Sequence, residues 1–240
     1  MFPIILDEVR RKAYYQKVLG IDRDNLIGYW PMWEASGGVA EDISPEGNDG
    51  AYTGVTLGQA GIGDGKTCPL FDGANDYNNI YSAALNTDFD GTEGTWALWT
   101  KVSGLGVWTD GKTNRGIHIG VNPSNETKIY NHTNNGLAWE YKAGGVTKTA
   151  TKVGITDIGW MHWALTWSLT NDEVIPYFNG IQEGSIHTGI GTWVGDLASS
   201  TCIIGAESTV PASVWDGNIA DVPLWNIALT AAQIAKLTVV

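Results

Sequence analysis

The sequence predicts an all-β fold in which two antiparallel sheets pack as a jelly-roll sandwich, with a short helix near each end. Short stretches rich in Val, Ile, Thr and Trp alternate with Gly, Asn, Asp or Pro clusters, a pattern typical of antiparallel sandwiches. The 240 residues include 31 glycines without a collagen-like period, which fits frequent tight turns. Hydrophobic residues make up 43% of the chain, which is enough to bury one sizeable core.

A helix is predicted over residues 6–19, where apolar residues recur at helical spacing between charged ones and Gly20 follows as a natural stop. We therefore expect residues 1–25 to form a helical lead-in. No later segment is long and polar enough to be a linker. Residues 26–240 are therefore expected to form one β domain.

The β region is predicted to run from Leu26 to about Val222. Its clearest hairpin is PYFNGIQEG, because Asn179-Gly180 can supply the positive φ angles of a type I′ turn. Helical spacing returns in NIALTAAQIAKL, where Thr230 and Gln233 have the spacing of a capping box. The stretches expected to form strands read LIGYWPMW, CPLFDG, GTWALWTKV, GIHIGV, TKIYN, LAWEYK, WMHWALTWS, EVIPYFNG, IQEGSIH and TCIIGAE.

The stretch WMHWALTWS is predicted to supply core side chains. Successive strand residues point to opposite faces, so Trp163, Leu165 and Trp167 share one face, which is large and apolar and is expected to be buried. The opposite face, around His162 and Thr166, is small and weakly polar, as expected where a sheet is solvated or lines a shallow groove. A binding role for this strand would have to come from that face.

In the related stretch TWALWTK, large apolar side chains fall on both faces of the predicted strand. Trp96 and Leu98 point to one side of the strand and Trp99 points to the other. Either one of these tryptophans lies on the non-core face, or both faces of the strand are covered.

The charge of the chain excludes some partners. A net charge of −12 would repel a phosphate backbone, so no nucleic-acid partner is expected. No stretch approaches the roughly 20 apolar residues of a membrane helix, so no membrane insertion is expected. The N-terminal stretch lacks the order of regions found in a secretory signal. The acidity is expected to serve solubility, with carboxylates gathered around calcium as the sharper alternative.

Two cysteines, Cys68 and Cys202, are too few for a disulfide framework or a cysteine-based zinc site. Each lies in a strand-like stretch, which favours buried free thiols. A single disulfide between them is the alternative.

The order of several motifs resembles that of laminin-G-like, pentraxin-like modules of the concanavalin A-like lectin/glucanase superfamily. The opening LIGYWPMWEASGGVAEDISPEGNDGAYTG resembles the family's aromatic-Trp-Pro-Leu start, acidic residue and D-x-S-G-x-G-N-x-G loop. CPLFDGANDYNNI resembles the strand SFDG-x-D-D-Y, and GWMHWALTWS resembles W-H-H-V-A-L-T-Y. The resemblance covers residues 26–237 and continues in family order through GTWALWTKV, VIPYFNGIQEGS, TCIIGAES and WDGNIADVPLWNIALTAAQIAKL.

This resemblance implies a concanavalin A-like jelly roll, a fold that hosts lectins, adhesion modules, calcium-dependent binders and some glycoside hydrolases. The lead-in VRRKAYYQKVLG, placed before a GYWPL-type opening, resembles modules in tail and virion proteins of bacterial viruses. We therefore expect a non-catalytic module that binds a glycan or cell-surface polysaccharide at a virion surface, with other virion proteins or further copies of itself as partners. The alternatives are an extracellular location and a purely structural virion protein, such as a capsid decoration or tail component, that binds no ligand.

Enzymatic activity is not expected. Glycoside hydrolases of this superfamily carry Glu-x-Asp-x-(x)-Glu on one strand, and retaining chemistry needs two carboxylates about 5–5.5 Å apart. Here Glu93 and Glu140 are isolated acids, and Asp172-Glu173 adjoin at a turn where successive side chains diverge. No nucleophile elbow, zinc-protease motif or P-loop is found. The histidines, which lack any ligand spacing, are His118, His132, His162 and His187.

Calcium is the cofactor that the resemblance implies. The family often carries one structural calcium near the first loop and the final strand, and the matching positions are Asp42, Asn48 and Asp221. Asp72 and Asp76 are further oxygen donors. The sequence departs from the family pattern where Pro45-Glu46 replaces Gly-Asn and Ala220 replaces an Asp. The alternative is that the aspartates form Asx turns and caps.

A sugar site would be a shallow groove with one or two exposed aromatic rings and oriented polar partners. Most tryptophans are expected in the core, with one or two exposed. The residues expected to bind carbohydrate are Trp99, Trp108, Trp139 and Trp193, with Asn131, Asn134 and Asn135 of the YNHTNNG loop.

Overall fold

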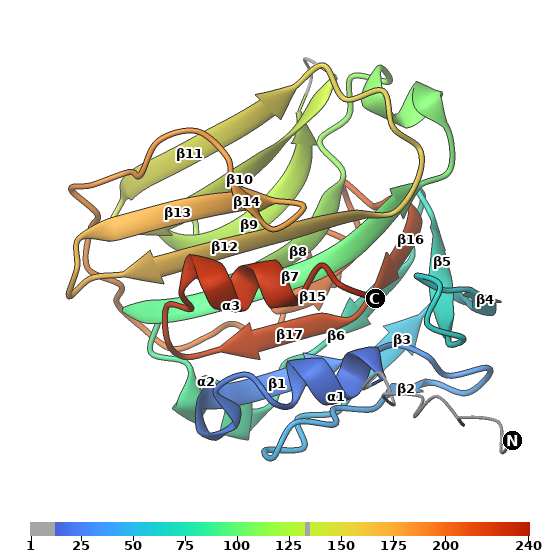
Figure 1. Cartoon of the computed structure of the whole chain (residues 1–240), viewed down its shortest axis with the longest axis horizontal. Helices are drawn as coiled ribbons and strands as arrows, with labels where there is room; N and C mark the ends of the chain where they lie inside the picture. The colour runs from blue at the N-terminus through green and yellow to red at the C-terminus, as the bar shows by residue number, and fades with distance from the viewer. Residues whose placement is uncertain (1–12, 133–134) are drawn as a thin grey trace, which may run out of the picture.

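The computed structural model describes residues 13–132 and 135–240. Two antiparallel sheets pack face to face, as predicted (Figure 1). Sheet A has the order β14-β13-β12-β7-β16-β5-β4, and β17 pairs with both β7 and β1. The strands of sheet A are β1 (Leu26–Trp30), β4 (Thr56–Ala60), β5 (Thr67–Asp72), β7 (Glu93–Val102), β12 (Met161–Ser168), β13 (Glu173–Phe178), β14 (Ile181–Gln182), β16 (Asp216–Ala220) and β17 (Val222–Trp225).

Sheet B has the order β11-β10-β9-β8-β15-β6-β3-β2. Its strands are β2 (Val39–Ala40), β3 (Gly50–Thr53), β6 (Tyr77–Asn79), β8 (Arg115–Asn122), β9 (Asn125–His132), β10 (Gly136–Ala143), β11 (Val146–Val153) and β15 (Ile203–Ile204). The helices are α1 (Tyr14–Val18), α2 (Ala83–Asp88) and α3 (Ala231–Lys236), with short 3-10 turns η1 (Arg23–Asn25) and η2 (Leu105–Trp108). Of the helix predicted over residues 6–19, the structure describes residues 13–19, and α1 occupies Tyr14–Val18 of these. Residues 6–12 lie outside the described residues.

The core between the sheets is built from the alternating side chains of the central strands. Trp163, Leu165 and Trp167 of β12 are buried against it, which confirms the predicted facing of this strand. Trp139 of sheet B packs on Trp163 with ring centroids 5.2 Å apart. The Trp163 indole N–H donates to Thr100 Oγ1 at 2.8 Å, so its polar atom is satisfied inside the core.

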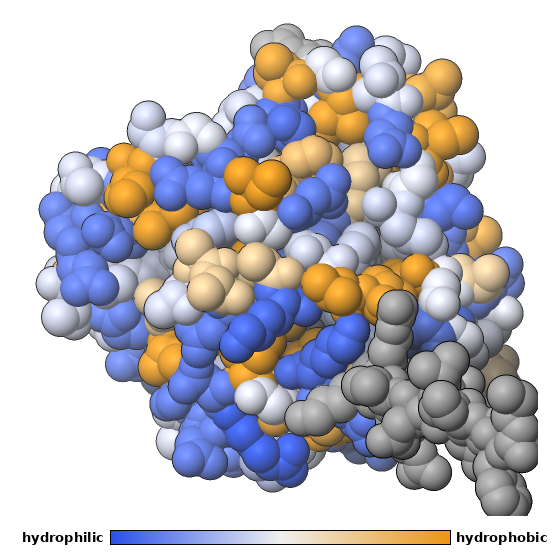
Figure 2. Space-filling model, in the orientation of Figure 1, coloured by the Kyte–Doolittle hydropathy of each residue, from blue (hydrophilic) through white to orange (hydrophobic). Residues whose placement is uncertain are grey.

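The outer face of sheet A is covered as well. The indole N–H of Trp99 donates to the Tyr14 hydroxyl at 2.9 Å, and that hydroxyl donates to the Leu237 carbonyl at 2.8 Å. Helices α1 and α3 therefore pack over β7 and β17, and Figure 2 shows polar and apolar side chains interspersed over them. Both faces of β7 are covered, which was one of the two predicted arrangements.

On this outer face of β12, His162 lies beneath neighbouring side chains, whereas Thr166 lines a hollow of about 300 Å³ between β12, β13 and the start of α3. Both side chains are buried, and burial lowers the pKa of His162 to about 3. The expectation of a shallow groove on this face is therefore confirmed at Thr166 and corrected at His162, where the Trp99 ring packs edge-on at 5.1 Å.

Several local predictions are confirmed. Asn179 and Gly180 have φ angles of 48° and 79° between the paired strands β13 and β14. The Thr230 capping box is present at the start of α3. Cys68 and Cys202 are buried free thiols, and burial raises the pKa of each to about 12. Within the described ranges, no helix is long and apolar enough to cross a membrane.

The Trp167 indole fills the space beside Gly94 of β7, so a larger residue at that position should destabilise the fold. A Cβ added to Gly94 would overlap the Trp167 indole, whereas a Cβ added to Gly106 in η2 meets nothing within 4 Å. We expect Gly94→Ala to lower the free energy of unfolding by about 1–3 kcal/mol, as overpacking does. Gly106→Ala is the control and should change it little. Urea unfolding measures both, and equal effects would contradict the packing described.

Candidate functional site

The tryptophans expected to bind sugar are all buried, so that expectation is corrected. Trp99 lies under α1, and Trp139 packs on Trp163 inside the core. Trp108 in η2 is 2% exposed, and Trp193 packs edge-on against Phe89. A sugar needs a free ring face to stack on, and these indole faces contact protein instead.

The asparagine loop also does not form the expected set. Asn131 is 1% exposed; its Oδ1 accepts from the Asn114 N–H and its Nδ2 donates to the Val107 carbonyl. Its amide therefore holds the chain together. Asn135 is exposed, with a φ of 58°. Asn134 lies outside the described residues.

Trp33 and Trp160 are the partly exposed tryptophans, and the other ten are buried. One or two exposed indoles were expected, but at other positions. Tyr15 lies edge-on to Trp33 at 5.3 Å, and the Lys66 ammonium lies 4.7 Å from the Trp33 ring centroid. Trp33 therefore already has a cation and an aromatic ring as partners.

Asp42, one of the positions that match the family's calcium ligands, accepts hydrogen bonds through both of its carboxylate oxygens. Its Oδ1 accepts from the backbone N–H groups of Tyr29 and Ser44, at 2.6 and 2.8 Å. Its Oδ2 accepts from the Ser44 hydroxyl and the Asn48 N–H, at 2.8 and 2.6 Å. A carboxylate has about four acceptor positions, and all four are filled. Asp42 therefore stabilises a turn through its hydrogen bonds, which agrees with the alternative prediction that the aspartates form Asx turns and caps.

The other calcium positions are also engaged. Asn48 donates to the Ile27 carbonyl and accepts from the Ser82 hydroxyl. Asp72 accepts from the Ala74 N–H within its own turn.

Asp76 accepts from the Asp72 N–H. The described part of the chain contains no group of three Asp, Glu, His or Cys side chains that could hold a metal ion. The five predicted residues therefore do not fit a shared calcium.

Asp221 is buried and accepts from the Tyr29 hydroxyl at 2.6 Å. Burial raises the pKa of Asp221 to about 8, although the Tyr29 hydrogen bond lowers it in part. A carboxyl with this pKa is largely protonated at neutral pH, and a protonated carboxyl is a poor calcium ligand.

These contacts predict that the fold does not need calcium. We expect the same melting temperature with excess Ca²⁺ and with EDTA, because the oxygens at the matching positions are already bonded within the chain. Differential scanning calorimetry at fixed ionic strength measures this. A rise in melting temperature with Ca²⁺ that EDTA reverses would contradict it.

The raised pKa of the buried Asp221 carboxyl predicts that the free energy of unfolding depends on pH. An aspartate in the unfolded chain has a pKa of about 3.9, so between pH 4 and 8 the native state holds a proton that the unfolded state has lost. The contribution of Asp221 to stability therefore falls as pH rises, by about 1.4 kcal/mol per pH unit. Asp221→Asn should gain stability relative to wild type over this range. Urea unfolding from pH 5 to 8 measures the gap, with the exposed Asp196→Asn as the charge control. Parallel curves for Asp221→Asn and wild type would exclude this effect.

A polar cluster lies on the outer face of sheet B. Along β8 and β9 the apolar side chains Ile117, Ile119 and Ile129 point into the core. The residues between them therefore point outward, and His118 and Lys128 stand directly opposite each other in register. Lys128 in turn pairs with Glu140 of β10, so three neighbouring strands bring their charged positions together.

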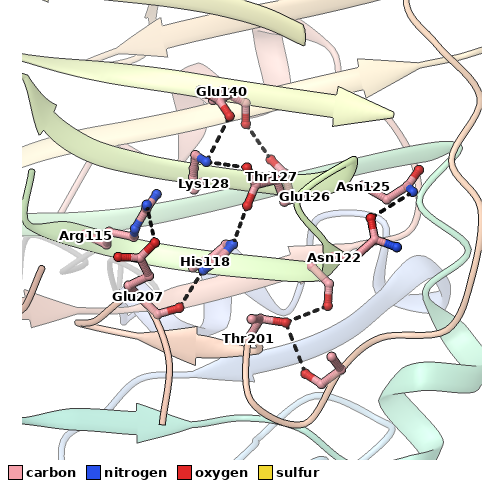
Figure 3. A network of polar contacts seen from close by, with 12 residues as sticks. Arg115, His118, Asn122, Asn125, Glu126, Thr127, Lys128, Glu140, Thr201 and Glu207 are labelled. Atoms are coloured by element: carbon pink, nitrogen blue, oxygen red, sulfur yellow. Dashed lines mark hydrogen bonds and ion pairs between the residues drawn. The ribbon is translucent and has the colours of Figure 1, made fainter. Parts of the chain in front are cut away.

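Figure 3 shows how these charges are paired. Lys128 Nζ lies 2.5 Å from Glu126 Oε1 and 2.9 Å from Glu140 Oε1. His118 Nε2 lies 2.9 Å from Glu126 Oε2, and its Nδ1 lies 2.6 Å from the Glu207 carbonyl oxygen. Lys128 thus contacts two acidic groups and His118 contacts one, so the side chains of the cluster hold one another in place.

A second ion pair ties the segment after β15 to this face. Arg115 Nη2 lies 2.8 Å from Glu207 Oε1, and the Arg115 guanidinium lies 5.6 Å from the Tyr130 ring centroid. Glu207 is therefore fixed through both its side chain and its carbonyl. The segment after β15 that contains Glu207 therefore lies against the outer face of β8.

The protonation state of Glu126 follows from this cluster. Burial by itself raises the pKa of Glu126, but hydrogen bonds from His118 and Lys128 outweigh it and lower the pKa to about 2. Glu126 is therefore ionised at neutral pH. Lys128 also contacts Glu140 at 2.9 Å, so one ammonium joins the two acids.

Beside the cluster is a hollow of about 250 Å³ between the β8–β9 hairpin and the segment that contains Glu207. Thr201 Oγ1 donates to the Gly120 carbonyl at 2.8 Å and closes one end. The volume is below the roughly 300–1,000 Å³ of pockets for drug-sized ligands, so it suits about one ring of a longer ligand. The lining residues are His118, Gly120, Asn122, Pro123, Glu126, Thr201, Glu207 and Ser208.

The sequence does not predict this site, because Glu140 is an isolated acid there and His118 is one of four histidines without ligand spacing. A signal was present: GIHIGV, TKIYN and LAWEYK each alternate polar with apolar residues. Alternation identifies the outward positions but not which of them are neighbours, because that depends on strand register.

The comparisons with known proteins agree with this fold. A family model described as the concanavalin A-like lectin/glucanases superfamily matches residues 51–235, and the chain belongs to this family. No curated protein matches the sequence.

Solved structures share the architecture. Domain 4 of AbnA, a GH43 extracellular arabinanase of Geobacillus stearothermophilus solved in complex with arabinotriose, has a TM-score of 0.60 at 15% identity over 90% of this chain and 98% of that one. The binding domain of Paraclostridial Mosquitocidal Protein 1 has a TM-score of 0.67 at 15% identity over 90% and 52%. Trypanosoma rangeli sialidase in complex with sialic acid has a TM-score of 0.64 at 15% identity over 90% and 33%. The chain thus spans about half of the toxin domain and a third of the sialidase, and identities this low show the fold alone.

Proposed function

We propose that the chain is a non-catalytic module that binds a glycan in the hollow on the outer face of sheet B. The observation that carries this proposal is the hollow itself, lined by fixed hydrogen-bonding groups on the sheet that no described helix covers. Helices α1 and α3 cover part of the outer face of sheet A, where a hollow of about 300 Å³ remains between β12, β13 and the start of α3. The arabinotriose complex of the structurally similar arabinanase domain supports a sugar as ligand.

The charges of the cluster support binding rather than hydrolysis. Glycoside hydrolysis needs one carboxyl that holds a proton for the leaving group. The low pKa of Glu126 opposes that role for this carboxyl. This carboxylate therefore serves to hold the neighbouring groups in place.

The setting of the module is proposed from the sequence resemblance alone. We place it at a virion surface, where glycan binding would attach the particle to a cell, with an extracellular location as the alternative. Other virion proteins or copies of the same chain are the proposed partners. Light scattering of the purified chain tests self-association, and a monomer at all concentrations would exclude the homo-oligomer.

Glycan binding can be tested directly on the hollow. We expect hits on a glycan array and, by isothermal titration calorimetry, about tenfold weaker binding of the best hit by Asn122→Ala/Thr201→Val, because two hydrogen-bonding groups are lost. Thr56→Val on the exposed edge strand β4 of sheet A is the matched control and should bind as wild type does.

An array without hits would contradict the proposed function. Full affinity in the double variant, with an unchanged melting temperature, would show that a glycan binds elsewhere on the molecule.

A further inference from the structure

We infer that the hollow on sheet B selects neutral glycans and rejects glycans that carry carboxylate or sulfate groups; this inference rests on the proposed glycan-binding function. It follows from which charges are already paired, which groups remain free, and what a ligand would have to displace.

The cations of the cluster are already engaged by acids of the chain. Lys128 contacts Glu126 and Glu140, and its side chain is only 10% exposed. Arg115 contacts Glu207, and its side chain is 12% exposed. Neither of these two cations lines the hollow. To reach Lys128, an anionic ligand would have to break its ion pairs and leave Glu126 and Glu140, each 13% exposed, without their partner, which is costly.

The acids, by contrast, border the hollow itself. Glu126 and Glu207 are both among its lining residues, and His118, the base that lines it, already contacts Glu126. Glu126 is ionised at neutral pH. A carboxylate or sulfate that entered would therefore approach negative charge at short range.

The free hydrogen-bonding capacity of the hollow favours ligands that donate. Thr201 Oγ1 donates to the Gly120 carbonyl and Ser208 Oγ donates to the Val210 carbonyl, so each hydroxyl oxygen keeps lone pairs for a ligand. Asn122 Oδ1 accepts from the Ser124 N–H, and the amide nitrogen of this exposed residue is a donor for a ligand oxygen. Sugar hydroxyls donate as well as accept, whereas a carboxylate or sulfate oxygen only accepts. A neutral, hydroxyl-rich ring is therefore the matching chemistry.

The discriminating measurement uses paired glycans that differ by one acidic group. The probes are a galactose-terminated oligosaccharide series on an array, the same glycans capped with sialic acid or sulfate, and calorimetry on the best neutral hit and its acidic counterpart. We expect the acidic counterpart to bind at least tenfold more weakly at moderate ionic strength.

Two variants separate a local effect from the overall charge. Glu207→Gln frees the positive charge of Arg115 beside the hollow, and it should reduce the discrimination against the acidic glycan several-fold. Glu183→Gln removes the same charge from the Lys152–Glu183 pair, which spans 3.0 Å elsewhere on the molecule, and it should leave the discrimination unchanged. Melting temperatures of both variants verify that they fold.

The outcomes are distinct. No binding of any glycan contradicts the proposed function, and the inference fails with it. Binding of the acidic counterpart as tightly as the neutral glycan overturns the inference while the function stands. Equal effects of Glu207→Gln and Glu183→Gln would assign the selectivity to the net charge of the chain, which overturns the role of the hollow.

Discussion

The arrangement of this molecule depends on the burial of strand β7 on both of its faces. Trp96 and Leu98 point between the sheets, and Trp99 points the other way. An indole left in water on that second face would forfeit one of the larger apolar burials available to the chain. The Tyr14 hydroxyl satisfies the Trp99 N–H and bonds the end of α3, so one hydrogen-bonded chain joins both terminal helices to the sheet.

This burial closes part of the outer face of sheet A, and the outer side of β8 to β10 is a face where polar groups meet a hollow. The same strand alternation that buries Ile117 and Ile129 on one side sets His118 and Lys128 on the other. Burying charges is expensive unless each is paired, and the pairing of Lys128 with two glutamates meets that condition. Because a paired group cannot turn freely, the lining of the hollow is held in place before any ligand arrives.

The fold class was predictable because its signals are local. Alternation assigned Trp163 and Trp167 to the core, the Asn179-Gly180 turn formed its hairpin, and Thr230 began its helix. The site was less predictable because its signals are not local. Trp99 is covered by Tyr14, which is 85 positions away, so no window of sequence around Trp99 reveals its burial.

The acidic positions show the same limit. The family resemblance marked Asp42 as a calcium ligand, but its oxygens are filled by N–H and O–H donors that only the folded turn brings together. Conversely, Glu126 and Glu140 look unrelated in sequence, and the register of β9 and β10 places both against one ammonium. That ammonium joins the two acids, and the hydrogen bonds from His118 and Lys128 keep Glu126 ionised. The cluster is therefore a fixed set of paired charges whose members only the strand register brings together.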